Sequence, residues 1–310
     1  MVLVAGEALF DVFVGGATST GFEMDARIGG SPLNVAIGLA RLGRPVAFLG
    51  GIGAGALGDR LVDAMAVEGV DTSPVQRIQA PTTLGLVAID GRGVPDYAFY
   101  GEGAADRCLV HASLKGVAGL KALHVGSYST VVGATADTLA QCVADAPEGC
   151  VVSYDPNVRL NVEPSIAAWR QRLAWMLPRT DFLKISEEDL LLLEPGTTPE
   201  DFVARGRRHG VGVVIVTRGA DGAVGGCATG MTSIPASLAG PLVDTVGAGD
   251  TYQAALLTWL DEQGLLSSEA MASLSIDALA AAMRFAAVAA GVTCTRRGAN
   301  LPRRSEVQVP

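Results

Sequence analysis

The stretch Val243-Asp244-Thr245-Val246-Gly247-Ala248-Gly249-Asp250-Thr251 carries the strongest signal in this chain. Its two glycines and alanine lead into residues 252–260, whose apolar spacing predicts a helix. Small residues let the backbone approach a ligand closely, and the first N–H groups of a helix have no partner within it. Together with the helix dipole, these donors predict an anion site formed by Gly247, Ala248 and Gly249.

Asp250 stands beside this predicted anion site. An acidic residue in the first turn of a helix is often only a cap that matches the helix dipole. A carboxylate at an anion site would, however, repel a ligand that was merely held there. The arrangement has a purpose if Asp250 takes a proton from an incoming hydroxyl while the N–H groups stabilise a phosphoryl group in transfer. The sequence therefore predicts Asp250 as a general base.

The second signal is Gly29-Gly30-Ser31-Pro32-Leu33-Asn34, in front of a predicted helix over residues 32–42. Ser31 is expected to cap this helix, with Pro32 at its first position and Gly43 ending it. The double glycine allows close backbone contact with a ligand, and the Asn34 amide offers both a donor and an acceptor. This combination suits a polyhydroxy ligand, although the same residues are also ordinary turn and cap chemistry.

Around these two motifs, short apolar runs alternate with longer helical patterns, which predicts an α/β fold with a mostly parallel sheet. The expected strands cover residues 2–5, 46–49, 122–125, 150–154, 182–185 and 213–217, and further helices cover 60–68, 134–144, 166–176 and 201–209. Two segments, at about 12–28 and 82–104, show strand-like alternation without helices. They predict a small antiparallel sheet that covers a site as a lid, or else surface hairpins. We expect one domain over residues 1–310, with the lid inserted in it.

Composition limits the function further. The 310 residues carry a net charge of -9, which argues against a nucleic-acid partner because that needs a basic face. The five cysteines form no C-x-x-C pair and predict no disulfide framework. The first residues resemble a strand rather than a signal peptide, and Arg284 interrupts the longest apolar run near the C-terminus. We therefore expect a cytoplasmic location and no membrane-spanning helix.

Further short motifs occur in a fixed order along the chain: Gly6-Glu7-Ala8-Leu9-Phe10-Asp11, Asp155-Pro156-Asn157-Val158-Arg159, Lys184-Ile185-Ser186-Glu187-Glu188-Asp189, Thr217-Arg218-Gly219-Ala220-Asp221-Gly222 and Thr293-Cys294-Thr295-Arg296-Arg297-Gly298-Ala299. With this set, the chain resembles the ribokinase-like (PfkB) carbohydrate kinases over nearly its whole length. The resemblance implies a three-layer α/β/α fold with a mostly parallel central sheet and a small β-sheet lid. It also implies ATP-dependent phosphorylation of a small sugar, and a homodimer formed through the lid.

The resemblance also implies roles for individual residues. Asp250 matches the catalytic base, and the anion hole matches Gly247, Ala248 and Gly249. The positions that hold the sugar match Asp11, Gly30 and Asn34, with Tyr100 and Arg159 as further candidates. The positions beside the ATP phosphates and ribose match Thr217, Gly219 and Gly222.

Two acidic residues match positions that act on metal ions. Asp244 matches a position that shapes a monovalent-cation site, usually for K⁺. Asp189 stands where the family usually has Glu in Asn-x-x-Glu, which acts on Mg²⁺ largely through water. Aspartate is one methylene shorter, a difference that contact through water tolerates.

The motifs are closer to those of fructokinases and 2-keto-3-deoxygluconate kinases than to those of ribokinases, which usually have Lys at the position of Ser31. Both of the closer groups commonly have Arg after the lid tyrosine, where this chain has Gly101 followed by Glu102. A keto-acid needs a cation for its carboxylate, so this change favours D-fructose, phosphorylated to fructose 6-phosphate. A 2-keto-3-deoxygluconate kinase, in which Arg159 would bind the acid, and a ribokinase-type activity stay open as alternatives.

A rival class rests on Gly53-Ala54-Gly55-Ala56-Leu57-Gly58, which matches the G-x-G-x-x-G pattern of dinucleotide-binding sites. Asp71 follows at nearly the distance such a site requires. An NAD-dependent oxidoreductase is therefore the remote alternative, although no catalytic Lys/Tyr pair or His accompanies the motif. A catalytically inactive sugar-binding module is disfavoured because Asp250 and its glycines are all present.

Overall fold

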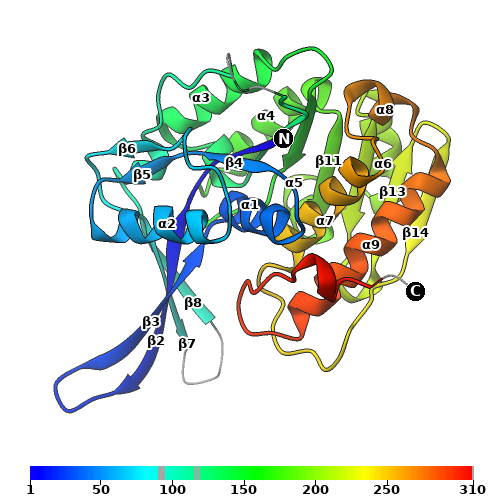
Figure 1. Cartoon of the computed structure of the whole chain (residues 1–310). Helices are drawn as coiled ribbons and strands as arrows, with labels where there is room; N and C mark the ends of the chain where they lie inside the picture. Colours follow the sequence, from blue (N-terminus) through cyan, green and yellow to red (C-terminus); the bar gives the residue numbers. More distant parts are fainter. Residues whose placement is uncertain (90–94, 115–116, 118, 309–310) are drawn as a thin grey trace.

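The computed structural model describes residues 1–89, 95–114, 117 and 119–308 (Figure 1). Residues 90–94 of the predicted lid segment 82–104 lie outside the described residues. The fold class predicted from the sequence is confirmed: a large, mostly parallel sheet lies between two layers of helices, with a smaller sheet at one end (Figure 1).

The large sheet has the strand order β14-β13-β12-β11-β10-β9-β1-β4 in the described part of the chain. The strands from β4 to β12 pair in parallel, whereas β13 and β14 pair antiparallel at one edge. The bounds are β1 Val2–Ala5, β4 Val46–Leu49, β9 Ala122–Gly126, β10 Val151–Asp155, β11 Phe182–Ser186, β12 Val213–Thr217, β13 Ala223–Cys227 and β14 Gly230–Ile234. The six strands expected from apolar runs are therefore present, each within one or two residues of its expected ends.

Alternate residues of each strand enter two separate cores, because side chains along a strand point to opposite faces. Val4 and Phe182 lie in the core covered by α1 Ser31–Arg41, α2 Ala56–Val67, α7 Ala248–Glu262, α8 Ser268–Ser273 and α9 Ile276–Cys294. Leu3 and Leu183 lie in the opposite core, under α3 Gly133–Ala144, α4 Ile166–Met176, α5 Glu187–Leu193 and α6 Pro199–Arg208. Short 3₁₀ turns are η1 Ala105–Arg107, η2 Tyr128–Thr130, η3 Leu177–Arg179, η4 Gly219–Asp221 and η5 Arg304–Glu306.

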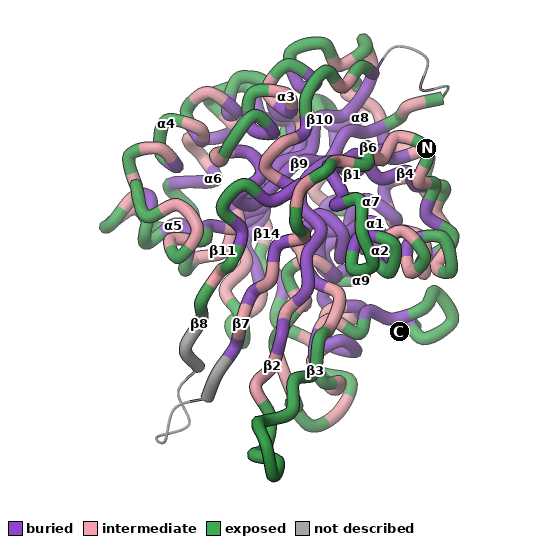
Figure 2. The backbone as a smooth tube through the Cα atoms, turned by 90° about the vertical axis from the view of Figure 1, so that its left-hand side faces the viewer, coloured by how far each residue is buried: buried purple, intermediate pink, exposed green. Residues whose placement is uncertain are grey.

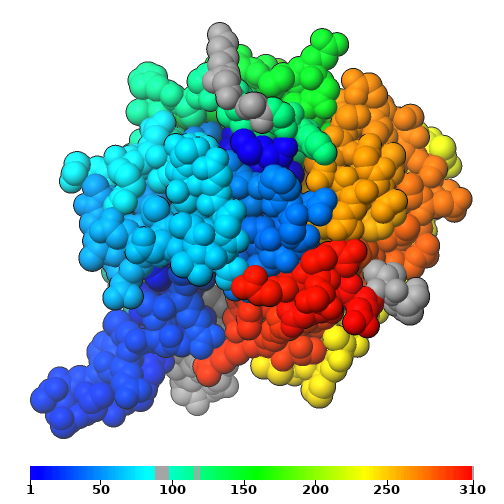
Figure 3. Space-filling model, viewed as in Figure 1, coloured from blue at the N-terminus to red at the C-terminus, as the bar shows by residue number. Residues whose placement is uncertain are grey.

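The small sheet consists of β3 Phe22–Gly29, β2 Leu9–Ala17, β7 Leu84–Ile89 and β8 Pro95–Tyr100, in that order. Its two hairpins are antiparallel, but the central pair β2–β7 is parallel. The sheet is therefore mixed and not antiparallel as expected, because β2 and β7 come from distant parts of the chain that α1 and α2 connect. The hairpin of β2 and β3 projects from the body (Figure 3), and its outer end is exposed (Figure 2).

The glycine pattern at residues 53–58 has a structural explanation. Gly53 ends β5 Gly51–Gly53, which pairs only with β6 Gln76–Ile78 in the described residues and lies outside the large sheet. Gly55 is the N-cap of α2, and a methyl group at Gly58 would overlap the carbonyl of Gly53. These glycines serve the turn and the close packing of α2, so the fold does not support the oxidoreductase alternative.

Helix α9 contains the apolar run that Arg284 interrupts. Despite Arg284, α9 is long and apolar enough to cross a membrane by length and composition alone. In the fold, 61% of its most apolar window is buried. The helix packs against α7, β13 and β14, so its apolar composition serves the core.

Candidate active site

The predicted anion site lies at the start of α7. Gly247 is the N-cap in the left-handed conformation, with φ +77°, and a methyl group there would lie 2.8 Å from the Cα of Ala299. The Ala248 N–H donates to the carbonyl of Thr245 at 3.1 Å, so it is engaged within the turn, contrary to expectation. Within the described residues, the N–H groups of Gly247, Gly249 and Asp250 have no hydrogen-bond partner. The start of α7 therefore offers free donors, as an anion site requires.

Asp250 is held by the first turn of α1. Ser31 Oγ donates to Asp250 Oδ1 at 2.6 Å, and Asn34 Nδ2 donates to Asp250 Oδ2 at 2.8 Å. Burial raises the pKa of the Asp250 carboxyl, while these two hydrogen bonds oppose the rise. The carboxylate thus has a fixed orientation and a raised basicity, both of which suit a general base.

The sequence prediction that Ser31 caps α1 is wrong. Helix α1 begins at Ser31 with Gly30 as its N-cap, and no side chain caps it. Gly30 has φ +103°, and a methyl group there would lie 2.7 Å from the carbonyl oxygen of Glu7. The Ser31 hydroxyl donates to Asp250 instead of capping the helix. The two residues are 219 positions apart in the sequence, and rules for helix caps consider only neighbouring residues.

Asp11 on β2 lies next to two glycines. A methyl group at Gly85 would lie 3.0 Å from Asp11 Oδ1, and one at Gly29 would overlap Asp11 Oδ2. Burial raises the pKa of Asp11 to about 6, the charge of Arg159 lowers it, and that of Asp250 raises it. Asp11 is therefore close enough to Arg159 and Asp250 for their charges to act on it, and the two glycines leave room for its carboxylate between the strands.

Tyr100, a predicted sugar residue, lies on the other face of β8 from Phe99. Asp11 pairs with Gly85, and Gly85 pairs with Phe99, whose ring contacts the Gly85 position. Because side chains alternate along a strand, Phe99 shares the face of Asp11 and Tyr100 points to the opposite face. Tyr100 is also 65% exposed. The structure thus places Phe99, and not Tyr100, on the face of the candidate sugar site.

A cavity of about 780 Å³ includes Ala248 and Gly249, at the start of α7, in its lining. The three residues predicted to lie beside the ATP phosphates and ribose also line it: Thr217, Gly219 and Gly222. Further lining residues are small or apolar and come from α9 and the segment after β14: Ala287, Ala290, Gly291, Pro235 and Leu238. Phosphates near Gly249 and a flat base against the apolar residues would suit this lining.

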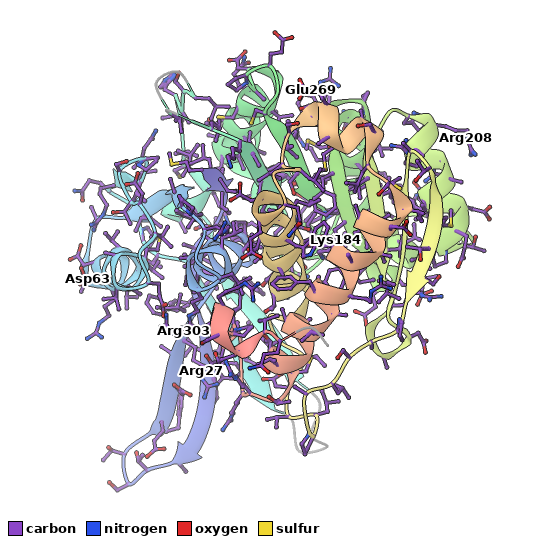
Figure 4. All side chains as sticks on the ribbon, turned by 45° about the vertical axis from the view of Figure 1, so that its right-hand side comes forward. Arg27, Asp63, Lys184, Arg208, Glu269 and Arg303 are labelled. Atoms are coloured by element: carbon purple, nitrogen blue, oxygen red, sulfur yellow. The ribbon has the colours of Figure 1, made fainter. Side chains whose placement is uncertain are left out.

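Lys184 and Asp155 form a buried ion pair that received no role from the sequence. Lys184 Nζ lies 2.6 Å from Asp155 Oδ2, and the two side chains are 3% and 5% exposed. Lys184 lies in the interior of the molecule (Figure 4), and its Nζ is 3.7 Å from where a Cβ would stand at Gly249. A cation therefore lies beside the predicted anion site and also lowers the pKa of Asp250.

Asp189, the predicted magnesium residue, is buried on α5. Its Oδ1 accepts from the Val158 N–H at 3.1 Å, and burial raises its pKa to about 6. The described residues contain no group of three or more His, Cys, Asp or Glu that would hold a metal ion by themselves.

Asp244 connects two loops at the start of α7. Its Oδ1 accepts from the Val246 N–H at 3.0 Å, and its Oδ2 accepts from the Gly298 N–H at 2.7 Å. Both oxygens are thus engaged by backbone donors. Asp244 therefore orders the loop around residues 294–300, a role in which it shapes a site more than it binds an ion directly.

Arg107 modifies the expectation drawn from Gly101. Its Nη2 lies 2.6 Å from where a Cβ would stand at Gly101, and its guanidinium lies over the ring of Tyr128. The Nε atom is buried without a hydrogen-bond partner in the described structure. Gly101, the residue after Tyr100, carries no charge, but the Arg107 guanidinium from η1 fills the space beside it.

Comparisons with known proteins agree with this geometry. The model of the pfkB family carbohydrate kinases matches residues 2–306. A fructokinase from Rhizobium leguminosarum bv. trifolii is 34% identical over 90% of this chain and 85% of its own length. The probable fructokinase-7 of Arabidopsis thaliana is 32% identical over 96% and 88%. The structure of a Xylella fastidiosa fructokinase with bound ATP superposes with a TM-score of 0.90, at 28% identity, over 99% of this chain and 96% of that one. The chain belongs to the pfkB family of carbohydrate kinases.

Proposed function

We propose that this protein is an ATP-dependent fructokinase that phosphorylates the 6-hydroxyl of D-fructose. The observation that carries the proposal is the setting of Asp250. Its charge and that of Arg159 both act on Asp11, and its neighbour Gly249 lines the large cavity. Relatives that cover most of the chain are named fructokinases, which supports this choice of sugar.

In the proposed reaction, the sugar hydroxyl attacks the γ-phosphorus of ATP as its proton passes to Asp250. The bond between the γ-phosphorus and the β,γ-bridging oxygen breaks, and ADP leaves. Ser31 and Asn34 fix the direction of the Asp250 carboxylate. The N–H groups at Gly249 and Asp250, with the charge of Lys184, stabilise the negative charge on the phosphoryl group.

Two ions belong to the proposal. Mg²⁺ on the nucleotide phosphates would supply charge neutralisation, with Glu187 and Glu188 of α5 in the lining of the cavity and the buried Asp189 next to them in the sequence. K⁺ would lie by the loop that Asp244 orders. We also propose that the small sheet acts as a lid over the sugar within one domain, that two copies associate through it, and that the protein is cytoplasmic.

Two arginines support the alternative that the protein is a 2-keto-3-deoxygluconate kinase. Arg107 places a guanidinium beside Gly101, and Arg159 lies near Asp11. Either cation offers a partner for a carboxylate, so the absence of Arg at position 101 argues less strongly against 2-keto-3-deoxygluconate than the sequence alone suggested. Fructose remains the proposal because the named relatives support it.

An ADP-release assay with ATP and Mg²⁺ over fructose, ribose, tagatose and 2-keto-3-deoxygluconate tests the proposal. We expect the highest kcat/KM with fructose, and ³¹P NMR should show phosphate on the 6-oxygen. Calorimetry with NAD and NADP serves as a control and should give no binding. A higher kcat/KM for the keto-acid would replace fructose, and turnover of no sugar in the panel would reject the proposed activity.

A further inference from the structure

The hydroxyl of Ser31 makes the shorter of the two side-chain hydrogen bonds to Asp250. The Oγ–Oδ1 distance of 2.6 Å is typical of a strong hydrogen bond to a charged oxygen. Ser31 is 9% exposed and lies in the first turn of α1, whose start is fixed by Gly30. Because β3 ends at Gly29, the hydroxyl is also close in sequence to the small sheet.

The charged groups around Asp250 come from three strands and from the loop after β10. Asp155 at the end of β10 raises its pKa, and Lys184 on β11 lowers it. The charge of Asp11 on β2 interacts with it, and Arg159 after β10 interacts with Asp11. Lys184 and Asp155 largely neutralise each other as an ion pair. The hydrogen bonds from α1 are therefore the specific contacts that favour the ionised carboxylate.

We propose that Ser31 is a positioning residue that holds the Asp250 carboxylate ionised and oriented for proton transfer. Asn34 holds the other oxygen, so removing Ser31 leaves a carboxylate with one fixed oxygen and one free. The inference rests on the proposed function in one respect, namely that Asp250 acts as the base.

The sign of the expected change follows from the hydrogen bond. A donor that contacts only the ionised form lowers the pKa, so its loss in Ser31→Ala raises the pKa of Asp250. The acid limb of the kcat/KM profile, which follows the base, should move up by about one pH unit. The plateau should fall by roughly 3- to 10-fold, because the free oxygen lets the carboxylate rotate. The KM for ATP should stay within about twofold.

The experiment measures kcat/KM from pH 5 to 9 with fructose as the varied substrate, for the wild type, Ser31→Ala and Ser31→Thr. Ser31→Thr keeps a hydroxyl and should restore the acid limb. The matched control is Ser165→Ala, which removes the hydroxyl that accepts from the Ala168 N–H at the start of α4. It should lower stability without moving the acid limb.

A second measurement does not depend on turnover. The ¹³Cγ chemical shift of Asp250, assigned by its disappearance in Asp250→Asn, gives the pKa of this carboxyl directly. A higher pKa in Ser31→Ala supports the inference even if the protein acts on another substrate, so its outcome is separate from that of the proposed function. An unchanged Asp250 pKa and an unmoved acid limb in folded Ser31→Ala would overturn it.

Discussion

Lys184→Met should be among the most destabilising single substitutions in this chain. The Lys184 and Asp155 side chains are 3% and 5% exposed, with Nζ and Oδ2 2.6 Å apart. Removing the lysine leaves a carboxylate that is buried and unpaired. Breaking a buried ion pair in this way costs about 3–5 kcal/mol, a large part of the stability of an ordinary domain.

The double variant Lys184→Met/Asp155→Leu separates the loss of the pair from the loss of one partner. Replacing both charges by apolar residues of similar volume is often neutral or stabilising. The double variant should therefore regain most of the free energy of unfolding. Since Lys184 also lies beside Gly249, the same variant should still bind ATP more weakly than the wild type.

Urea unfolding at pH 7.5 gives these free energies, with circular dichroism as the probe. The control is the exposed pair Arg77–Asp59, whose side chains are 38% and 59% exposed, and Arg77→Met should cost less than about 1 kcal/mol. A Lys184→Met variant as stable as Arg77→Met would refute the argument. A double variant no more stable than the single one would also contradict it.

Three further substitutions probe other features. Gly247→Ala should destabilise the protein by about 1–3 kcal/mol in urea unfolding and weaken ATP binding, because φ is +77° and the added methyl group would lie 2.7 Å from the Cβ of Ala299; unchanged stability would contradict this. Arg107→Ala should raise the KM for the sugar without changing that for ATP, and an equal rise in both would show that the guanidinium does not serve the sugar site. Burial raises the pKa of Glu7 to about 7, so the native state keeps a proton that the unfolded state loses, and stability should fall as pH rises from 4.5 to 7. Glu7→Gln should make this fall smaller in urea titrations across that range, and the raised pKa values of Asp11 and Asp189 account for the fall that remains.

Much of the fold follows from local pattern. The strand runs are short and apolar because both faces of the large sheet are covered, and Gly30 and Gly247 mark helix starts that need positive φ. Asp250 could be proposed as a base because a carboxylate beside free N–H donors makes chemical sense only if it accepts a proton. The strands and the helix starts depend on neighbouring residues, and so the sequence sufficed to predict them.

The features that sequence analysis missed depend on register or on distant contacts. The face of Tyr100 is set by the pairing of β7 with β8, and Ser31 meets a residue 219 positions away. Lys184 did carry a signal, since it is a lone charge in an apolar strand run and Asp155 ends the neighbouring parallel strand. Because the carboxyl ends of adjacent parallel strands lie together, the ion pair between Lys184 and Asp155 could have been predicted from the sequence.

The most direct test of the central claim is the turnover of Asp250→Asn with fructose and ATP. The amide keeps the shape of the side chain, and Ser31 can reverse its hydrogen bond to accept from it, so the fold and ATP binding should survive. We predict that kcat falls by roughly 10²- to 10⁴-fold, with the KM for ATP nearly unchanged, because a base acts only in the transition state. A folded Asp250→Asn enzyme with a kcat close to that of the wild type would contradict the assignment of Asp250 as the base.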